Sequence, residues 1–229
     1  IILTMKNISK SFSGVAALKN GELTLEAGEV VALMGENGAG KSTLMKILTG
    51  IYDKDGGTIT YMGNEVEFKG PAASEKAGIA IVHQELNMMS DLTVAQNLFI
   101  GKECMKGLFI DDALMVEKAK ALFDVLNIDI DPAERIGALT VGKQQMVEIA
   151  KAISYDAKII IMDEPTSAIP EREVEHLHRM IKRLTDFGVA IIYITHKMDE
   201  VFKISDDITI FRDGKHVGSY AAKDLDRDK

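Results

Sequence analysis

The stretch GENGAGKST, from Gly35 to Thr43, is the feature that most constrains how this chain can fold. It has the spacing of a phosphate-binding loop, in which a glycine, any four residues and a second glycine precede lysine and then serine or threonine. The preceding EVVALM is an apolar, β-branched run typical of a buried strand. The following TLMKILTG has apolar residues at helical spacing and ends in glycine. Strand, glycine-rich loop and helix in this order predict an α/β fold.

The residue types of this loop suit the phosphate chain of a nucleotide. Glycines such as Gly35, Gly38 and Gly40 let backbone N–H groups approach phosphate oxygens, and the start of the next helix adds the positive end of its dipole. Lys41 is predicted to reach the β- and γ-phosphates, and the Ser42 hydroxyl is predicted to bind Mg²⁺. The remaining loop residues that we assign to nucleotide binding are Asn37, Ala39 and Thr43.

A later apolar run, KIIIMD, ends in the acidic pair Asp163 and Glu164. Enzymes with a phosphate-binding loop carry an aspartate at such a strand end to hold Mg²⁺, often through water. An adjacent glutamate can act as a general base on the attacking water. An acidic first turn of the next helix would explain the same pair. With the loop upstream, the catalytic interpretation is favoured.

Short apolar runs recur along the chain, and several are continuous rather than alternating, which predicts a mostly parallel sheet covered on both faces. The runs are LTMKNI, ELTLE, VVALM, GTITYM, EVEFK, IAIVH, KIIIMD, VAIIYIT and DITIF. Between Leu92 and Tyr155 the pattern becomes helical. One expected helix face there consists of Met115, Ala119, Leu122 and Leu126. We therefore expect a single domain, 1–229, with core segments 1–91 and 156–229 and a helical subdomain at about 92–155.

Composition narrows the class of protein. The 229 residues include 27 basic and 35 acidic side chains, a net charge of −8 without a basic tract, which argues against nucleic acid as a main partner. The single cysteine, Cys104, excludes an internal disulfide and is interpreted as a buried or incidental thiol. There is no run of 18 apolar residues and no signal-peptide layout, so we expect no membrane span.

A guanine nucleotide is the alternative ligand that the sequence raises. Guanine-reading proteins carry Asn-Lys-x-Asp after a strand, and THKMD has Lys197 and Asp199 at that spacing. The asparagine position, however, holds His196. DKDG at Asp53–Gly56 matches another such motif, but no strand precedes it. We interpret both matches as coincidences and expect ATP.

The whole chain resembles the ATP-binding cassette ATPases. The resemblance rests on the phosphate-binding loop, Gln84 in IVHQEL, the segment LTVGKQQMVEIAKA, the pair Asp163–Glu164, and His196 in YITH, in that order. It implies an α/β fold: a P-loop NTPase core with a mostly parallel sheet, an antiparallel β subdomain and an inserted helical subdomain. It also implies ATP and Mg²⁺ as ligand and cofactor.

The resemblance assigns roles to single residues. It implies that Gln84 contacts Mg²⁺ and the attacking water and senses a membrane partner, that His196 contacts the γ-phosphate, and that Phe12, in KSFSGV, stacks on adenine. Taken singly, these residues have ordinary explanations: a solvated glutamine, an edge histidine and a core phenylalanine. The expected catalytic set is Lys41, Gln84, Glu164 and His196, and the expected metal set is Ser42, Gln84 and Asp163.

LTVGKQQ is similar to the cassette signature Leu-Ser-Gly-Gly-Gln in altered form. Thr140 keeps the hydroxyl and Gly142 keeps a close backbone approach, whereas Val141 and Lys143 replace the first glycine and the glutamine. The resemblance implies that Thr140, Gly142 and the helix starting there bind the γ-phosphate of a partner cassette, with ATP between the two. Pro170, before the expected helix EREVEHLHRMIKRL, stands where the family usually has aspartate, which we expect to affect cross-talk between the two ATP sites.

The segment FKGPAASEKAGIAIVHQELNMMSDLTVAQNLFIGKE and the valine in the signature more closely resemble bacterial importers of ribose and other monosaccharides, in the first cassette of a fused two-cassette protein. The implied function is ATP hydrolysis that powers sugar import at the cytoplasmic face of the bacterial inner membrane. The implied partners are a second cassette, an integral membrane permease and, indirectly, a sugar-binding protein, but no nucleic acid. The resemblance further implies that the chain is about half of its natural protein.

A coupling helix of the permease would then dock near Gln84 to Gly101. Apolar residues there form either the docking groove or the core of the helical subdomain: Met88, Met89, Leu98, Phe99 and Ile100. Three alternatives to sugar import stay open. They are a cytosolic cassette ATPase without a permease, an importer of another small solute such as a nucleoside, and a module that binds ATP but barely hydrolyses it. The presence of Lys41 and Glu164 argues against the last.

Overall fold

The computed structural model describes residues 1–83 and 87–225, which divide into two compact units. The first unit comprises 1–81, 157–164 and 184–229, and the second comprises 82–156 and 165–183. This division differs from the predicted one at Leu92 and Tyr155, since the second unit starts earlier and includes most of a later helix. In that helix, Glu173 accepts a hydrogen bond from Thr140, and Arg183 donates one to the Val125 carbonyl. Most of the helix therefore belongs to the second unit.

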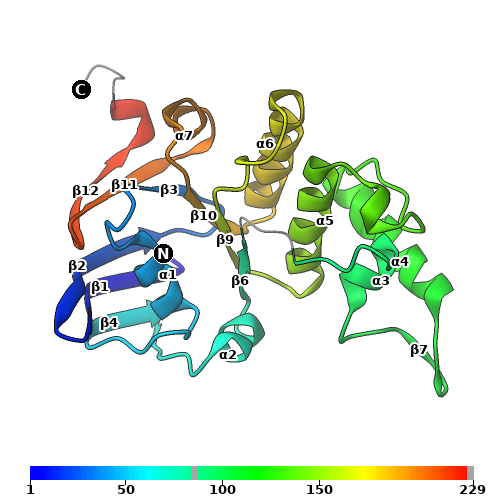
Figure 1. Cartoon of the computed structure of the whole chain (residues 1–229), viewed down its shortest axis with the longest axis horizontal. Helices are drawn as coiled ribbons and strands as arrows, with labels where there is room; N and C mark the ends of the chain where they lie inside the picture. The colour runs from blue at the N-terminus through cyan, green and yellow to red at the C-terminus, as the bar shows by residue number, and fades with distance from the viewer. Residues whose placement is uncertain (84–86, 226–229) are drawn as a thin grey trace. The chain divides into compact units, whose positions relative to one another are not determined.

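The first unit is built around a mixed sheet (Figure 1). Its strands are β1 (Leu3–Phe12), β2 (Val15–Leu25), β3 (Val30–Met34), β4 (Gly56–Tyr61), β5 (Asn64–Glu65), β6 (Ile79–Val82, at the boundary of the unit), β9 (Ile159–Asp163), β10 (Ala190–Ile194), β11 (Asp207–Arg212) and β12 (Lys215–Ala221). Its helices are α1 (Lys41–Leu48), α2 (Pro71–Lys76) and α7 (Met198–Ile204), with a 3₁₀ turn at Ala222–Asp224.

The strand order is β5-β4-β1-β2-β12-β11-β3-β10-β9-β6. Strands β11, β3, β10 and β9 run parallel to one another, whereas β5, β4, β1 and β2 form antiparallel pairs. The antiparallel strand β12 joins the two parts, since it pairs with β11 and touches β2 through Lys215 and Asn20. The predicted α/β core, with its additional antiparallel part, is therefore confirmed.

The continuous apolar runs occupy the middle of this sheet. All five residues of β10 are buried, as are the first four of β3 and of β9, because strands in a parallel sheet are covered on both faces. Helix α1 buries its apolar face in the same core, and that face consists of Leu44, Met45, Ile47 and Leu48.

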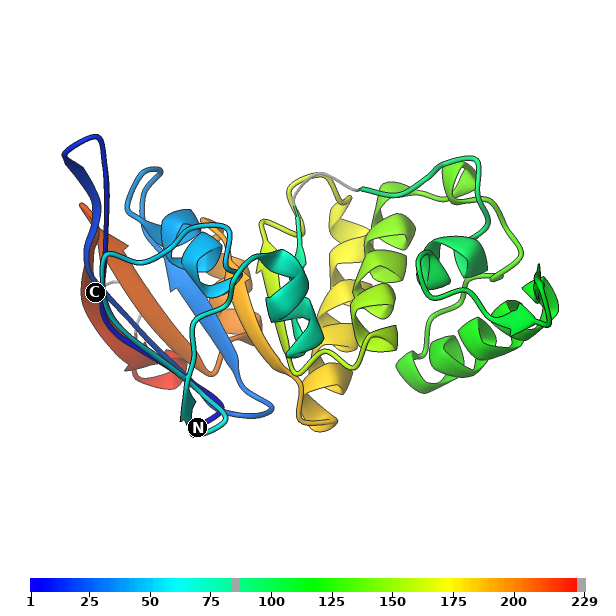
Figure 2. The ribbon, with the colours of Figure 1, turned by 90° about the horizontal axis from the view of Figure 1, so that it is seen from below.

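Three features of the sheet were not predicted correctly. EVEFK forms a strand only at its start, in β5. Beyond the strand, Val66 and Phe68 still pack against the core, so the alternation reflects burial rather than strand pairing. The predicted runs LTMKNI and ELTLE are parts of longer strands, which form the β1–β2 hairpin, dark blue in Figure 2. The start of β2, from Val15, was missed because its first residues are largely exposed. Strand β12 was missed because it is mostly exposed and interrupted by Gly218, which weakens the apolar alternation.

The second unit is helical, as predicted. Its elements are α3 (Val94–Phe99), a small hairpin of β7 (Met105–Lys106) and β8 (Phe109–Ile110), α4 (Asp112–Leu126), a 3₁₀ turn at Ile136–Ala138, α5 (Val141–Ser154) and α6 (Glu171–Asp186), whose last turn belongs to the first unit. Among residues 1–83 and 87–225, no helix is both long and apolar enough to cross a membrane.

Helix α4 shows how local sequence sets the boundaries of these helices. Asp111 caps its start by accepting a hydrogen bond from the Leu114 N–H at 3.0 Å, and Asn127, in the left-handed conformation, ends it. The predicted apolar face is correct except at one position, where Phe123 is buried and Leu122 is half-buried. Both positions lie within the same apolar stripe of a helix with 3.6 residues per turn.

Asn97 fastens the segment before α3 to that helix. Its side chain is 2% exposed. It accepts a hydrogen bond from the Met89 N–H at 2.9 Å and donates to the carbonyl oxygens of Met89 and Thr93, each at 3.0 Å. Buried amides of this kind stabilise a fold because every polar atom has a partner.

We expect Asn97→Ala to lower the free energy of unfolding by about 2–3 kcal/mol, because it leaves the Met89 backbone groups without these partners. Denaturant unfolding of the chain would measure this loss. Asn64→Ala removes an exposed amide that donates a hydrogen bond to the Met62 carbonyl, and it should cost less than about 0.5 kcal/mol. Equal losses for the two variants would contradict the assigned role of Asn97.

Candidate functional site

The loop from Gly35 to Gly40 connects β3 to α1 in a conformation that needs its glycines. Gly40 caps α1 with a φ of 102°, in the region that favours glycine. A Cβ on Gly40 would lie 2.9 Å from Leu18 Cδ1, and one on Gly35 would collide with the Phe211 carbonyl. On Gly38 a Cβ would meet nothing within 4 Å, so the loop is open on that side.

Lys41 folds back over this loop. Its Nζ donates hydrogen bonds to the carbonyl oxygens of Gly35 at 2.6 Å and Glu36 at 3.0 Å. Burial lowers the pKa of Lys41, while the negative charges of Asp163 and Glu164 act in the opposite direction. A cationic amine, open backbone and the start of a helix, whose first N–H groups lack helical acceptors, together suit a phosphate chain.

The register of the parallel strands brings the acidic pair and the histidine to this edge of the sheet. Ile194 of β10 pairs with Leu33 of β3 on one side and with Asp163 of β9 on the other. The loop after Leu33, the pair Asp163–Glu164 and His196 therefore all follow neighbouring strand ends. The first unit thus gathers Lys41, Asp163, Glu164 and His196 from distant parts of the sequence.

Glu164 and His196 contact each other directly. His196 Nδ1 lies 2.9 Å from Glu164 Oε1, with the glutamate side chain 27% exposed and the histidine side chain 69% exposed. Glu164 has a φ of 46°, in the left-handed region, and its N–H donates to the Ile194 carbonyl at 2.9 Å. A non-glycine residue rarely adopts this conformation, and such residues concentrate at functional sites.

The chemistry of the donors at this edge fits Mg²⁺. Ser42 is exposed at the start of α1 and Asp163 is half-buried at the end of β9. Within the described part of the chain no group of three or more acidic, histidine or cysteine side chains could hold a metal. Magnesium needs no such group, since one or two carboxylates and substrate phosphates usually bind it. Gln84, the third predicted ligand, lies outside the described residues.

Phe12 ends β1 and is 40% exposed, so its ring is accessible. Tyr52 packs edge-on against it, with the ring centroids 5.0 Å apart, and Lys10 Nζ lies 5.6 Å from the centroid of the Phe12 ring. Sequence analysis did not identify Tyr52, because the two rings are far apart in the chain and meet only through tertiary structure.

In the second unit, Thr140 is the N-cap of α5, and the predicted start of this helix is confirmed. Its Oγ1 accepts a hydrogen bond from the Lys143 N–H at 3.4 Å and donates one to Glu173 Oε2 at 3.2 Å. Gly142 is buried, and a Cβ on it would collide with the Glu173 carboxylate, whereas Val141 is 41% exposed. Sequence analysis did not identify Glu173, since its contact with Thr140 depends on how α6 packs.

Pro170 directly precedes α6, and its carbonyl oxygen accepts a hydrogen bond from the Glu173 N–H at 2.8 Å.

The apolar residues expected near a permease divide into three groups by burial. Leu98 is fully buried and belongs to the core of the second unit, whereas Met89 is 55% exposed. The half-buried members are Met88, Phe99 and Ile100.

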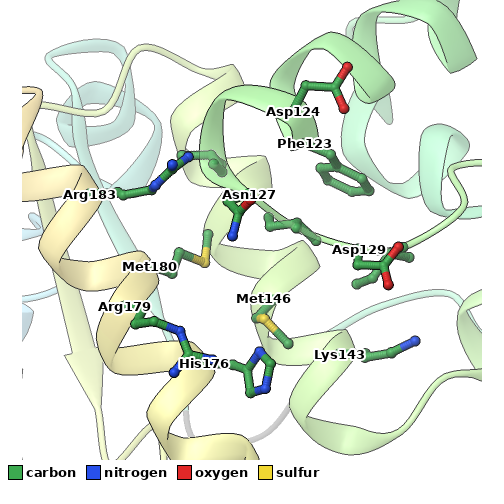
Figure 3. Close-up of a pocket in the computed structure, with 13 residues that line it drawn as sticks. Phe123, Asp124, Asn127, Asp129, Lys143, Met146, His176, Arg179, Met180 and Arg183 are labelled. Atoms are coloured by element: carbon green, nitrogen blue, oxygen red, sulfur yellow. The ribbon is translucent and has the colours of Figure 1, made fainter.

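A cavity of about 700 Å³ lies within the second unit, between the end of α4 and one face each of α5 and α6 (Figure 3). Arg183 on its wall donates a hydrogen bond to the Val125 carbonyl at 2.6 Å. Lys143, one of the residues that depart from the signature pattern, also lines it. The other lining residues are Phe123, Asp124, Leu126, Asn127, Ile128, Asp129, Ile130, Met146, His176, Arg179 and Met180.

The comparisons with known proteins agree with this geometry. Residues 18–167 match the family model described as ABC transporter. The galactose/methyl galactoside import ATP-binding protein of Mannheimia succiniciproducens is 54% identical over 97% of this chain and 44% of its own length. The protein of the same name from Salmonella typhimurium is 50% identical over 100% of this chain and 45% of its own length. The chain thus spans somewhat under half the length of these relatives.

Solved structures are also similar. A nucleotide-free ATP-binding cassette from an ABC transporter is 26% identical, with a TM-score of 0.84, and covers 96% of this chain and 91% of its own. The ADP conformation of an ATP-binding cassette of an ABC transporter is 26% identical, with a TM-score of 0.83 and the same coverage.

Glu148 on α5 provides a test of the electrostatics of the second unit. Burial raises its pKa to about 7, although Lys151 and the Asn87 N–H act against this. Its Oε2 is buried and has no hydrogen-bond partner among the described residues. Because the pKa is raised in the folded state, the stability due to the protonated form is present below pH 4.5 and is lost as the pH rises towards 7.

We therefore expect Glu148→Gln to stabilise the chain at pH 8 by about 1–2 kcal/mol, a value discounted for partial exposure. The gain should shrink steadily as the pH falls to 4.5, the ordinary pKa of the side chain. Thermal unfolding across this pH range would measure it. Glu117→Gln, at an exposed position of α4, is the matched control. A gain that does not change with pH would contradict the role of burial.

Proposed function

The chain belongs to the ABC transporter family, and from this membership and its geometry we propose that it binds and hydrolyses ATP to power the import of a monosaccharide through a membrane permease. The observation that carries the ATPase part is the meeting of Lys41, Asp163, Glu164 and His196 at one edge of the parallel sheet. These residue types match the requirements of phosphoryl transfer to water.

The residues divide this work between binding and chemistry. Lys41 and the open backbone of the loop bind the β- and γ-phosphates, and the exposed ring of Phe12 stacks on adenine. Ser42 and Asp163 would hold Mg²⁺, which would supply positive charge to neutralise the phosphate oxygens.

Glu164 and His196 act on the reacting groups. Glu164 accepts a proton from the attacking water as the general base. In its protonated form, His196 donates from both ring nitrogens: Nδ1, 2.9 Å from Glu164 Oε1, orients that carboxylate, and the other nitrogen donates towards the γ-phosphate. The left-handed backbone of Glu164, tied to the Ile194 carbonyl, fixes the position from which the side chain reaches the water.

A second cassette completes the site. Thr140 is exposed at the start of α5, where a hydroxyl, backbone N–H groups and the helix dipole suit a phosphate. We propose that this end of α5 serves the ATP bound by another cassette, and that a fused second cassette is the natural partner. The length of the relatives supports this, since each is more than twice as long as the matched segment.

The transported solute is proposed from the relatives, which are named for galactose and methyl galactoside import. We propose a monosaccharide as the solute and the cytoplasmic face of the bacterial inner membrane as the location. The permease would dock on the second unit near Met89, whose exposed side chain suits an apolar contact. A sugar-binding protein would act through that permease. Import of another small solute by the same chemistry is the alternative.

The ATPase proposal predicts different failures for two variants. Lys41→Ala should weaken Mg·ATP binding by at least about tenfold to hundredfold, because it removes a charged donor from the loop. Glu164→Gln should bind Mg·ATP normally and lose about 10²–10⁴-fold in turnover, because the base acts mainly in the transition state. Fluorescent-nucleotide titration and phosphate release measure the two quantities.

Lys203→Ala, at an exposed position of α7, is the matched control for loss of a cation and should change neither quantity. Turnover that survives Glu164→Gln would show that another group is the base. Normal nucleotide binding by Lys41→Ala would rule out the loop as the phosphate site.

A further inference from the structure

The Glu173 carboxylate lies on the part of α5 where a phosphate is proposed to bind. Glu173 Oε2 accepts the Thr140 hydroxyl at 3.2 Å, and the carboxylate packs so closely over Gly142 that no side chain fits there. Both contacts lie within the second unit. Glu173 is half-buried and Thr140 is exposed, so the pair faces solvent on one side.

The hydroxyl of Thr140 cannot serve Glu173 and a phosphate together. A threonine hydroxyl has one O–H to donate. Its acceptor side already receives the Lys143 N–H at 3.4 Å, as the N-cap of α5. A phosphate oxygen is only an acceptor, so it needs the same O–H that Glu173 now receives.

Charge adds to this competition. A carboxylate at the start of a helix is stabilised by the helix dipole, as a phosphate would be. Two anions close together at one helix end repel each other. Glu173 is therefore bound in the way that the incoming γ-phosphate would be, by the same hydroxyl and the same helix end.

We propose that Glu173 is a positioning residue that holds Thr140 and Gly142 in a phosphate-free arrangement, and that it must release Thr140 before the γ-phosphate of a second cassette can bind there. This proposal rests on the function proposed above and deepens it. It makes the Thr140–Glu173 contact a barrier to association of two cassettes that ATP binding has to overcome.

The test uses the 229-residue chain carrying Glu164→Gln, so that bound Mg·ATP is not consumed. Sedimentation at saturating Mg·ATP measures self-association of this parent and of Glu173→Ala. In a symmetric pair two Thr140–Glu173 contacts must open, and each is worth a few-fold in affinity. We expect Glu173→Ala to associate about tenfold or more tightly than the parent.

Two further variants separate charge from a general effect of substitution. Glu173→Gln keeps an acceptor oxygen and loses the charge, so its association should be intermediate and less dependent on salt than that of the parent. Glu175→Ala removes a carboxylate from the same helix, where it pairs with Arg179, and should leave association unchanged. Thermal unfolding checks that each variant is folded.

With Glu164 intact, Glu173→Ala should reach half-maximal turnover at a lower protein concentration, with an unchanged maximal rate. A merely structural role would instead reduce the maximal rate. Association of Glu173→Ala that equals or falls below that of the parent overturns the inference, as does the absence of association in every variant. Titration of the chain with a fluorescent ATP analogue tells these outcomes apart. If the chain binds nucleotide but Glu173→Ala does not associate more tightly, only this inference is refuted. If the chain binds no nucleotide, the proposed function is refuted as well.

Discussion

The candidate site depends on one constraint, the parallel hydrogen-bonded register of β3, β10 and β9. Ile194 pairs with Leu33 and Asp163, so the phosphate-binding loop, the acidic pair and His196 begin at the same level of the sheet. The buried apolar runs of these strands fix that register, because they are covered on both faces. The site residues lie at the ends of the strands or on short connections after them, and the rigid sheet fixes their positions.

Under the proposed function, the first unit binds the phosphates of the chain's own ATP, and the second unit contributes to the ATP site of another cassette. In the first unit, the positive charge of Lys41 lies near the negative charges of Asp163 and Glu164, and its Nζ donates hydrogen bonds to carbonyl oxygens of the loop. In the second, the start of α5 is already engaged by a carboxylate, that of Glu173. A phosphate chain would replace intramolecular partners in both places, so its binding energy is partly used to break existing contacts. Under this proposal, ATP binding is favoured only when a second cassette is available.

Sequence analysis predicted what depends on local patterns. The loop and its flanking strand and helix, the acidic pair at the end of β9 and the start of α5 follow from residues adjacent in the chain. It missed features that depend on contacts between residues far apart in the sequence. The Glu173–Thr140 and Phe12–Tyr52 contacts join residues brought together only by folding. Strand β12 was missed because it lacks an apolar pattern. The left-handed conformation of Glu164 was missed because glutamate, unlike glycine or asparagine, does not indicate such a conformation in the sequence.

The central claim is that a single chain supplies an incomplete ATPase site and that a second cassette completes it. Turnover per chain as a function of protein concentration tests this most directly. At net charge −8, two chains repel at low salt, so the series belongs at several ionic strengths. The account predicts slow turnover at low concentration that rises as chains associate, more readily at higher salt. A high rate that does not depend on concentration, from a chain that stays monomeric, would contradict it.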